Sequence, residues 1–455
     1  MVQKRIRDAI YGIVEISERE MEIINTPAFQ RLRYIRQLAT TYMVYPGAEH
    51  TRFGHSIGVM HIASRVIQSL KSKRPDVFFK EKAQYEIHWA WMEQMLRLMA
   101  LTHDLGHPPF SHAGEGLLPD NRDHEYYTRM IVLETEIGGI INKIGQEFLD
   151  QHKEIDECFS VAERPKDITA ESVIDLYTGK NLYKDYEHIL NFLMDSDLDC
   201  DKMDYLLRDS HYCGVRYGQF DLERLLASLV VGESVDDESV KRVVIRRDGV
   251  HAFEEFVLAR YFMFLQVYYH KTRRILDISL CDYIRAKNKN GYPKTVRGYL
   301  KWTDNKVLEM LHRDAEKHLT KTEEDLNTPQ AKPLLAAHIF STRTFPRVVF
   351  QTNAHTDPNS SDDYKRAKAS LKRRFPDIHI IEDDPSKLPH QLPSAVLDGE
   401  KAVYVIKEDG KTANIMSVSY ILNTITSKIQ IFRMYVDYDI HKQARDHLDS
   451  RTILF

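Results

Sequence analysis

Apolar residues recur at helical spacing through most of the chain before residue 286. Between residues 57 and 70 they return every three or four positions, which places them on one face of a helix. Segment 84–103 repeats the pattern. Segments 189–209 and 250–278 are rich in Leu, Phe and Tyr at the same spacing and contain no proline. The pattern predicts a mainly α-helical domain over residues 1–285.

Shorter apolar runs predict a small amount of β-structure. Two such runs flank Asp248-Gly249, a pair typical of a tight turn, so we expect one small β-hairpin there. The composition becomes charged over 286–344, which predicts a helical connector, and mixed over 345–455, which predicts a small C-terminal α/β lobe. Within the lobe we expect strands at 347–351, 402–407 and 429–436, and a helix at 361–374 capped by Ser360 or Ser361.

The composition excludes several protein classes. Of the 455 residues, 43% are hydrophobic and 29% are charged, so the chain is neither collagen-like nor wholly disordered. Lys and Arg total 63 against 67 Asp and Glu, a net charge of −4, so a site for a polyanion has to be a local pocket. The 4 cysteines form neither a disulfide framework nor a CxxC zinc pattern.

Membrane association is not expected. The N-terminus is charged and lacks the apolar run of a signal peptide, and no stretch approaches the ~18 apolar residues that a spanning helix needs. We therefore expect no membrane partner and a cytoplasmic location.

Histidines and aspartates stand in an order that suits a metal site. His55 is followed by the pair His103-Asp104 and later by Asp201, all within helical sequence. A single histidine is more often structural, but imidazoles and carboxylates together suit a divalent transition metal such as Fe, Mn, Ni, Co or Zn. Adjacent residues reach one cation only from a helix end, and the glycine and prolines after Asp104 supply that end. The sequence predicts a metal site that leaves positions open for water or phosphate.

Further histidines and several cations surround this order. His107, His112 and His124 are not needed as ligands, and their pKa near neutrality makes them acid–base candidates. Glu115 lies one helical turn from His112, where a carboxylate can orient the ring. Single basic residues usually face solvent, but those on helices that carry or flank the ligands are candidates for binding phosphates; they are Arg52, Lys202, Arg260 and Lys271.

These residues carry a family resemblance. The order from His55 to Asp201 resembles the metal-binding signature of the HD-domain phosphohydrolases. The flanking sequence is similar to the deoxynucleoside triphosphate (dNTP) triphosphohydrolases that carry SAM and HD domains, and to their bacterial relatives. The resemblance covers residues 4–280, and we expect no SAM domain because nothing precedes residue 4. The motifs that carry it are Phe29-Gln30-Arg31-Leu32-Arg33-Tyr34-Ile35-Arg36-Gln37-Leu38, Arg52-Phe53-Gly54-His55-Ser56-Ile57-Gly58-Val59 and Asp201-Lys202-Met203-Asp204-Tyr205.

The resemblance implies an activity and its catalytic residues. Water would attack the α-phosphorus of a dNTP, accompanied by Mg²⁺ or Mn²⁺, and release a deoxynucleoside and inorganic triphosphate. His112, paired with Glu115, and His124 would be catalytic, and His107 would face the triphosphate. No residue that would select one base is apparent, so we expect broad use of dNTPs.

The resemblance also implies how the substrate is held. Arg52, Lys202 and Arg260 match phosphate contacts, and Tyr268 matches a residue beneath C2′ of the sugar that excludes a 2′-hydroxyl. Gln37 and Asp209 match groups that hold the 3′-hydroxyl. The other matching positions in the substrate site are Leu38, Tyr205 and Lys271.

Regulation is implied as well. The family forms homo-oligomers, tetramers or dimers of dimers, that are activated by a dNTP or GTP bound between subunits. Asn25 stands where the family carries an aspartate that takes two hydrogen bonds from guanine, and an amide offers only one acceptor, so guanine-specific activation is weakened here. The other matching positions are Lys4, Gln30, Arg33, Arg224 and Arg343.

Two other functions stay open. The first is a different HD phosphohydrolase, a phosphodiesterase or nuclease acting on nucleotides or nucleic-acid ends; the sugar pocket of Gln37, Asp209 and Tyr268 argues against it. The second is a nucleotide sensor or a binder of single-stranded nucleic acid. The complete set of ligands and extra histidines argues against a protein that only binds, although such binding can coexist with catalysis.

Overall fold

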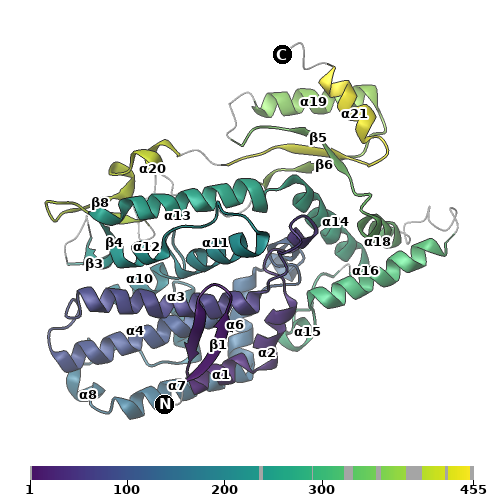
Figure 1. Ribbon diagram of the computed structural model, residues 1–455. Coiled ribbons are helices and arrows are strands. Elements are labelled where there is room, and N and C mark those ends of the chain that lie inside the picture. The colour runs from purple at the N-terminus through teal and green to yellow at the C-terminus, as the bar shows by residue number, and fades with distance from the viewer. Residues whose placement is uncertain are drawn as a thin grey trace.

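The molecule consists of a large helical body with a smaller lobe above it (Figure 1). The structure is a computed structural model that describes residues 3–234, 239–288, 290–321, 332–354, 360–385, 402–425 and 429–450. The mainly helical class predicted from the sequence is confirmed. The helices of the body are α1 (Glu18–Ile24), α2 (Pro27–Gln30), α3 (Arg52–Lys73), α4 (Lys82–Thr102), α5 (His112–Glu115), α6 (His124–Glu134), α7 (Glu136–Gln151), α8 (Ile155–Cys158), α9 (Ala170–Tyr177), α10 (Asp185–Phe192), α11 (Cys200–Cys213), α12 (Leu222–Ser228), α13 (Val250–Met263), α14 (Lys271–Lys287), α15 (Val296–Tyr299), α16 (Asp304–Leu319) and α18 (Lys332–Thr342).

Helices α3 and α4 pack side by side in the body, on the left in Figure 1. They cover the segments in which the sequence predicts amphipathic helices, and the predicted apolar face is buried, including Met60 and Leu70 of α3. In α4 the indole N–H groups of Trp89 and Trp91 donate to the carbonyls of Pro75 and Lys166, so both buried rings keep a polar partner. The packed pair fixes the positions of His55 in the first turn of α3 and of His103 at the end of α4.

Two of the predicted helical segments each contain a break. Segment 189–209 ends one helix at Phe192 and begins the next after Asp199, whose side chain accepts the backbone N–H of Lys202 and so caps α11. Segment 250–278 is interrupted by a π-helical turn, Phe264–Tyr268, before His270 caps α14. Breaks of this kind bring side chains at helix termini into the interior of the body, where function concentrates.

The predicted hairpin at residues 248–249 is wrong. Strand β4 (Lys241–Arg246) instead pairs antiparallel with β3 (Leu229–Glu233), and the chain after it turns directly into α13. Gly249 is required for the close approach of this turn to α12, since a Cβ there would lie 2.1 Å from the Cβ of Ser228. The Asp-Gly pair thus marks the start of a helix rather than a β-turn.

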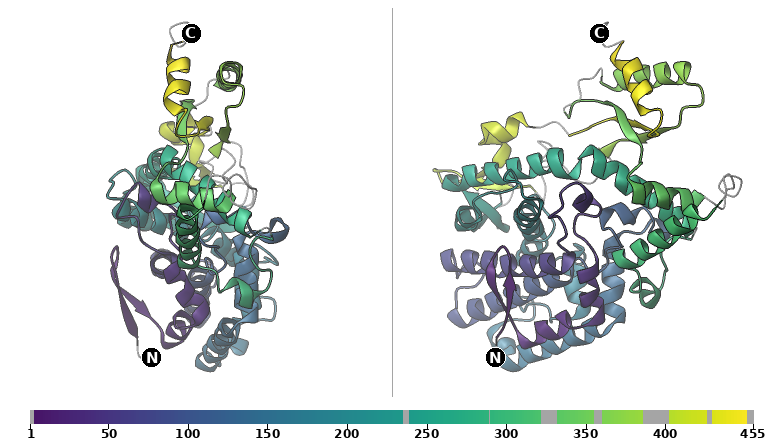
Figure 2. Two further views of the ribbon diagram at one scale, coloured as in Figure 1. Left: turned by 90° about the vertical axis from the view of Figure 1, so that its right-hand side faces the viewer. Right: turned by 45° about the vertical axis from the view of Figure 1, so that its right-hand side comes forward.

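An antiparallel hairpin that the sequence does not predict begins the described chain. Strands β1 (Lys4–Asp8) and β2 (Gly12–Ile16) pair in register around Gly12, whose φ of 76° suits a residue without a Cβ. The hairpin stands at one side of the body, against the helices (Figure 2). Its inward residues Val14 and Ile16 are fully buried, so the hairpin is part of the core rather than a loose end.

The C-terminal region divides between two places. Strands β5 (Arg347–Gln351), β9 (Arg433–Val436) and β6 (Ile380–Asp383) form a sheet in the order β5-β9-β6, with α19 (Ser360–Arg374) and α21 (His441–Asp449) packed against it as a lobe. Strands β7 (Tyr404–Ile406) and β8 (Thr412–Asn414) instead extend the sheet of the body, in the order β3-β4-β7-β8, and α20 (Tyr420–Thr424) follows them. The predicted strands and helix of this region are present, although the predicted strand 429–436 begins later.

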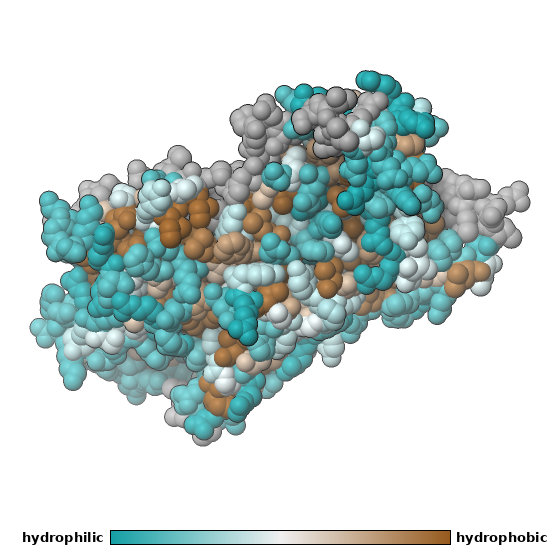
Figure 3. Space-filling view, turned by 45° about the horizontal axis from the view of Figure 1, so that its top comes forward, coloured by the Kyte–Doolittle hydropathy of each residue, from teal (hydrophilic) through white to brown (hydrophobic). Residues whose placement is uncertain are grey.

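The lobe has a hydrophilic outer face. Figure 3 shows hydrophilic side chains predominating over it, and α19 begins with Asp362 and Asp363 and ends with Lys372, Arg373 and Arg374. This order of charges complements the helix dipole. In the described residues, the hydropathy and length of every helix fall short of what crossing a membrane requires.

Residues of the charged segment 286–344 pack into the body. Tyr299, Trp302 and Val307 are buried in the same hydrophobic core as α3 and α4. The division of the chain at residues 285 and 344 stays a prediction, but this burial ties α15 and α16 closely to the helical body.

Candidate metal and catalytic site

The four predicted metal ligands converge in the interior. His55 lies in the first turn of α3, His103 ends α4 with Asp104 next to it, and Asp201 lies in the first turn of α11. Nε2 of His55 lies 2.8 Å from Oδ1 of Asp201 and 3.5 Å from Oδ2 of Asp104. Nε2 of His103 lies 3.3 Å from Oδ1 of Asp104 and 3.6 Å from Oδ1 of Asp201. Residues far apart in the sequence therefore present two ring nitrogens and two carboxylates to one point.

The other ring nitrogen of each histidine is occupied, which fits metal binding. Nδ1 of His55 lies 2.8 Å from Oδ2 of Asp204, and Nδ1 of His103 lies 2.7 Å from the carbonyl oxygen of Ala100. Both contacts require an N–H on Nδ1, so the lone pair of each Nε2 faces the cluster. Neither Nε2 makes a hydrogen bond within the described part of the chain, although both are buried. The set fits a divalent transition metal, as the sequence predicts.

The neighbouring charges shift the pKa values of the residues in this cluster. Burial alone raises the pKa of a carboxyl group, but Arg52 and the neighbouring histidines hold the pKa of Asp104 well below its usual range. Interactions with the nearby rings of His103 and His55 likewise outweigh burial and hold the pKa of Asp201 well below its usual range. For His55, burial lowers the pKa, and the adjacent carboxylates raise it to about 10. The carboxylates are therefore ionised, as metal ligation requires.

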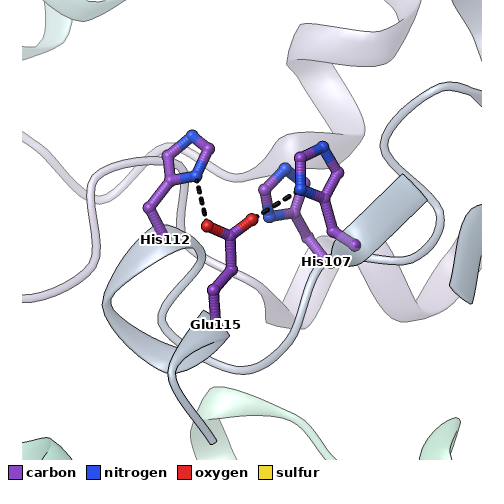
Figure 4. A group of neighbouring side chains, drawn as sticks. His107, His112 and Glu115 are labelled. Atoms are coloured by element: carbon purple, nitrogen blue, oxygen red, sulfur yellow. Dashed lines mark hydrogen bonds and ion pairs between the residues drawn. The ribbon is translucent and has the colours of Figure 1, made fainter. Parts of the chain in front are cut away.

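A second cluster adjoins the first and centres on Glu115. Figure 4 shows this carboxylate between imidazole rings. Nδ1 of His112 donates to one oxygen at 3.2 Å, and Nδ1 of His124 donates to the other at 2.5 Å. The ring of His107 stacks on that of His124 with centroids 3.9 Å apart, and its Nε2 lies 3.3 Å from Oδ1 of Asp104. The sequence predicts the pairing with His112, whereas the bridge to His124 appears only in the structure.

The pKa values within this cluster are driven apart. Burial raises the pKa of Glu115, but His112 and His124 outweigh it and hold the pKa far below its usual range. Burial lowers the pKa of His124, and the hydrogen bond with Glu115 raises it above its ordinary value. Burial, Arg52 and His124 together hold the pKa of His107 well below its ordinary value. Two histidines with opposite shifts provide a proton donor beside a neutral ring, an arrangement typical of acid–base sites.

The loop that carries these histidines is held in a strained conformation. Phe110 and Ser111 have φ values of 60° and 52°, which cost non-glycine residues about 1–3 kcal/mol each. Asp304 of α16 accepts the backbone N–H of Phe110 at 2.7 Å and that of Arg36 at 2.9 Å. The hydroxyl of Ser111 donates to the carbonyl of Arg36 at 2.6 Å and accepts from Nε of Arg52 at 2.8 Å. These contacts keep the loop against the metal cluster.

A pocket opens beside both clusters. The empty space within it is about 680 Å³, which includes open solvent at its mouth. His112 and Ser111 line it, so the pocket reaches the histidine cluster. The predicted substrate residues in its lining are Gln37, Leu38, Arg52, Tyr205, Asp209 and Tyr268.

In the lining of the pocket, Asp209 links two side chains. It accepts the hydroxyl of Tyr268 at 2.7 Å, and its other oxygen lies 2.7 Å from Nε2 of His50, whose ring stacks on Tyr212. Burial and Asp209 raise the pKa of Tyr268 well above its usual value, so the hydroxyl stays protonated and donates. Oε1 of Gln37 is buried and makes no hydrogen bond within the described residues, so it can accept one from a ligand.

The remaining predicted cations lie outside the lining of this pocket. Lys202 and Arg260 pair with Asp199 at 2.6 Å and with Asp197 at 2.9 Å. Lys271 begins α14 and lines a second pocket of about 450 Å³ between α14, β5 and α21. Its other lining residues are Thr272, Ile275, Phe345, Pro346, Arg347, Val348, Tyr435, His441 and Arg445. Among the described residues, this lining contains several cations and no carboxylate.

The predicted activator residues fall into separate groups. Gln30 donates to the carbonyl of Ile24 at 2.7 Å and accepts from Nε of Arg33 at 2.8 Å, close to Asn25 at the end of α1. The others are dispersed: Lys4 begins β1, Arg224 donates to the carbonyl of Asp248 at 2.7 Å, and Arg343 donates to the carbonyl of Met43 at 3.2 Å.

Three residues of the site escape sequence reasoning. Asp204 orients His55, and its only signal is its position one helical turn after Asp201. His50 and Asp304 are held against the site by contacts across the fold, and no local pattern distinguishes them from other polar residues.

The fold and the site define a mainly helical protein with a buried histidine–aspartate cluster suited to a divalent metal, beside an acid–base cluster of histidines. A family model of the HD domain matches residues 52–174, and a model of the HD associated region matches residues 220–328. The chain belongs to the HD-domain family.

Curated relatives and solved structures agree with this assignment. The chain is 35% identical over 296 residues to the uncharacterised protein YwfO of Bacillus subtilis, covering 64% of this chain and 58% of the relative. It is 31% identical over 331 residues to the human deoxynucleoside triphosphate triphosphohydrolase SAMHD1, covering 68% of this chain and 51% of the relative. The chain thus spans little more than half the length of these two relatives.

Two solved structures match nearly the whole chain. A hypothetical protein from Aquifex aeolicus has a TM-score of 0.70 at 28% identity and covers 98% of this chain and 100% of its own. A phosphohydrolase from Bacteroides thetaiotaomicron has a TM-score of 0.65 at 21% identity, covering 96% of this chain and 100% of its own, which shows the shared fold.

Proposed function

We propose that the protein hydrolyses deoxynucleoside triphosphates to a deoxynucleoside and inorganic triphosphate. One observation carries the proposal: Tyr268 and Asp209 line the same pocket as Arg52 and His112. A sugar held by the first pair would place its phosphates beside the metal and histidine clusters. The name of the human relative, a deoxynucleoside triphosphate triphosphohydrolase, supports this substrate class.

The residues divide the work of this reaction. His55, His103, Asp104 and Asp201 would hold a divalent metal, which would withdraw charge from the phosphate and lower the pKa of a water molecule. The water adds to the α-phosphorus, the bond from that phosphorus to the 5′-oxygen breaks, and the 5′-oxygen takes a proton from the histidine cluster. The triphosphate leaves with the oxygen of the water.

Acid–base catalysis is assigned to the cluster around Glu115. This carboxylate holds the Nδ1–H of both His112 and His124, so it fixes both rings, and it stabilises the protonated form of His124. His124, whose pKa is raised by Glu115, is the proton donor in this scheme, and His112 lines the pocket beside it. Arg52 is buried beside Asp104 and the pocket, where its charge attracts phosphate.

The test is to incubate the protein with each dNTP and NTP in the presence of Mn²⁺ or Mg²⁺ and to separate triphosphate, pyrophosphate and phosphate. We expect triphosphate from dNTPs and none from Asp201→Ala. Asp156→Ala, which removes an exposed carboxylate on α8, is the matched control and should retain activity. Release of phosphate or pyrophosphate would contradict the proposal and favour a different HD phosphohydrolase. Binding without turnover would favour a nucleotide sensor.

Nucleotide activation is a second part of the proposal, and the second pocket favours it. Lys271, Arg347 and Arg445 surround this pocket, and the guanidinium of Arg347 lies over the ring of Phe345, 4.7 Å from its centroid. Several cations in one lining suit the phosphates of a nucleotide, although Arg445 also pairs with Asp449 at 3.5 Å, and an aromatic ring suits its base. Arg343, a predicted activator residue, also lies over Phe345.

To test activation, turnover of one dNTP is measured with and without a second nucleotide, and the mass in solution is followed by light scattering. We expect stimulation and assembly into a homo-oligomer, both reduced in Arg347→Gln. Arg366→Gln, which changes a cation on the exposed face of α19, should behave as the unaltered protein. Constant turnover and constant mass across all added nucleotides would contradict activation.

A further inference from the structure

A chain of buried charged groups joins the N-terminal hairpin to the metal cluster. Nδ1 of His55 donates to Oδ2 of Asp204 at 2.8 Å. Arg208 donates two hydrogen bonds to Asp204, from Nε to Oδ2 at 2.8 Å and from Nη2 to Oδ1 at 3.0 Å. Its Nη1 donates to Oδ2 of Asp8 at 2.9 Å. Asp8 ends strand β1, so this series of charged groups runs from the N-terminal hairpin to the predicted metal ligand His55.

The interior is shaped around this chain. Asp204 and Arg208 lie one helical turn apart on α11, so both side chains point from the same face toward α3. A Cβ on Gly58 of α3 would lie 2.0 Å from Oδ1 of Asp204 and 2.3 Å from Arg208, so only glycine leaves room for the pair. Asp204 and Arg208 are at most 2% exposed, and Asp8 is 8% exposed, so solvent screens the chain only weakly.

Asp8 also shapes the hairpin. Its Oδ1 accepts the backbone N–H groups of Ile10 at 2.8 Å and Tyr11 at 3.1 Å, which closes the turn between β1 and β2. One carboxylate therefore both forms the hairpin turn and neutralises Arg208. The hairpin cannot move away without leaving the buried guanidinium paired with Asp204 alone.

We propose that Asp204, Arg208 and Asp8 are positioning residues for the metal ligand His55, and that the seating of the β1–β2 hairpin sets the affinity of the metal site. Asp204 orients the ring of His55 and makes its Nε2 a better donor. Arg208 holds Asp204 in place, and Asp8 shares the charge of Arg208, which leaves Asp204 free to accept from His55. Without Asp8, Asp204 must satisfy Arg208 alone, and it becomes a weaker acceptor for His55.

Asp8→Asn separates the two roles of Asp8. Asparagine keeps Oδ1 for the turn but replaces Oδ2 with an NH₂ group, which cannot accept from Arg208. We expect metal affinity, measured by competition with a chelator in the absence of nucleotide, to fall about tenfold, at the lower end of the range for residues that support metal ligands. Asp204→Asn should lower it more, because it changes the contact to His55 itself. Arg5→Gln breaks only the exposed pair with Glu15 on the same hairpin and should leave affinity unchanged.

Linkage adds a readout on the hairpin itself. If the hairpin raises metal affinity, the metal must stabilise the seated hairpin by the same factor. Adding Mn²⁺ should slow amide hydrogen exchange over residues 4–16 in the wild type and in Arg5→Gln, but not in Asp8→Asn. A circular dichroism spectrum checks that each variant is folded. Arg208→Lys is a second variant: it keeps the positive charge but loses the guanidinium group that bonds Asp204 and Asp8 at the same time, so it should also lower metal affinity.

The outcomes separate this inference from the metal centre on which it rests. Wild-type affinity in a folded Asp8→Asn, or exchange that Mn²⁺ slows equally in that variant, would overturn the link while leaving the metal centre intact. A wild type that binds no metal would overturn the metal centre itself. Because no nucleotide is used, neither result depends on the identity of the substrate.

Discussion

Asp304 accepts the backbone N–H of Phe110 at 2.7 Å, although 194 residues separate the two along the chain. Asp304 begins α16, inside the segment that matches the HD associated region, whereas Phe110 belongs to the loop between His107 and His112, two of the predicted catalytic histidines. The same carboxylate also holds the backbone of Arg36. The associated region therefore shapes the loop of the candidate active site through a direct hydrogen bond to its backbone.

Asp304 should make stability depend on pH. Burial raises its pKa to about 6, against an ordinary value of 3.8. A folded-state pKa above the unfolded value favours the protonated folded state, so this contribution is full below pH ~4 and is lost as the pH rises through about 6. We expect the free energy of unfolding of the wild type, minus that of Asp304→Asn, to fall by about 2–3 kcal/mol over this interval. Urea unfolding at several pH values measures it.

The control for Asp304 is Asp282→Asn, which changes an exposed carboxylate of α14. Its difference from the wild type should stay nearly constant with pH. A constant difference for Asp304→Asn as well would show that the carboxyl group is not held in a raised-pKa state.

Replacing Glu115 should affect both histidines that it holds. In Glu115→Gln the negative charge is lost, so the pKa of His124 should fall and kcat should drop by about 100-fold, as is typical on loss of acid–base assistance. The pH–rate profile should shift its alkaline limb to lower pH, because the protonated imidazole is no longer stabilised. Glu134→Gln, on the exposed face of the same helix as His124, should leave the profile unchanged. An unaltered alkaline limb in Glu115→Gln would argue against its role.

Tyr268 should exclude ribonucleotides through its ring. Tyr268→Ala should lower the preference for dNTPs over NTPs, measured as the ratio of kcat/KM values, toward unity from about 100-fold, the scale at which a pocket rejects one hydroxyl by shape. Tyr268→Phe keeps the ring and loses only the hydrogen bond to Asp209, so most of the preference should remain. Equal loss of preference in both variants would assign discrimination to the hydroxyl instead.

Removing the metal should lower thermal stability. A ligand present at about 100 times its Kd stabilises the folded state by about 2.7 kcal/mol. We expect EDTA to lower the Tm of the wild type by several degrees and Mn²⁺ to restore it, with no metal-dependent change in Asp201→Ala or His103→Ala. Differential scanning calorimetry measures the effect, and Asp156→Ala serves as the control. If neither EDTA nor Mn²⁺ changes the Tm of the wild type, the result would contradict a metal site that includes Asp201 and His103.

The features that the sequence predicted are those with a local cause. The apolar face of α3 follows from spacing alone, and His103 next to Asp104 at a helix end indicates chemistry because few other patterns place two ligands together. The hairpin at Asp248-Gly249 was mispredicted for the same reason: the dipeptide has a strong local preference for turns, and burial of Gly249 against Ser228 overrode it. Local preference is a few tenths to about 1 kcal/mol per residue, less than a tight packing contact costs to break.

By itself, the sequence determined the helical class, which depends on residue types at short spacings, and it supplied the candidate metal ligands and candidate acid–base histidines through their residue types and order. Only the tertiary structure decided that Glu115 serves two histidines, that β7 leaves the lobe to join β4, and that Asp8 reaches His55 through Arg208. Buried polar groups must find partners within the fold, and which partner each one meets depends on how distant segments pack, which no local pattern encodes.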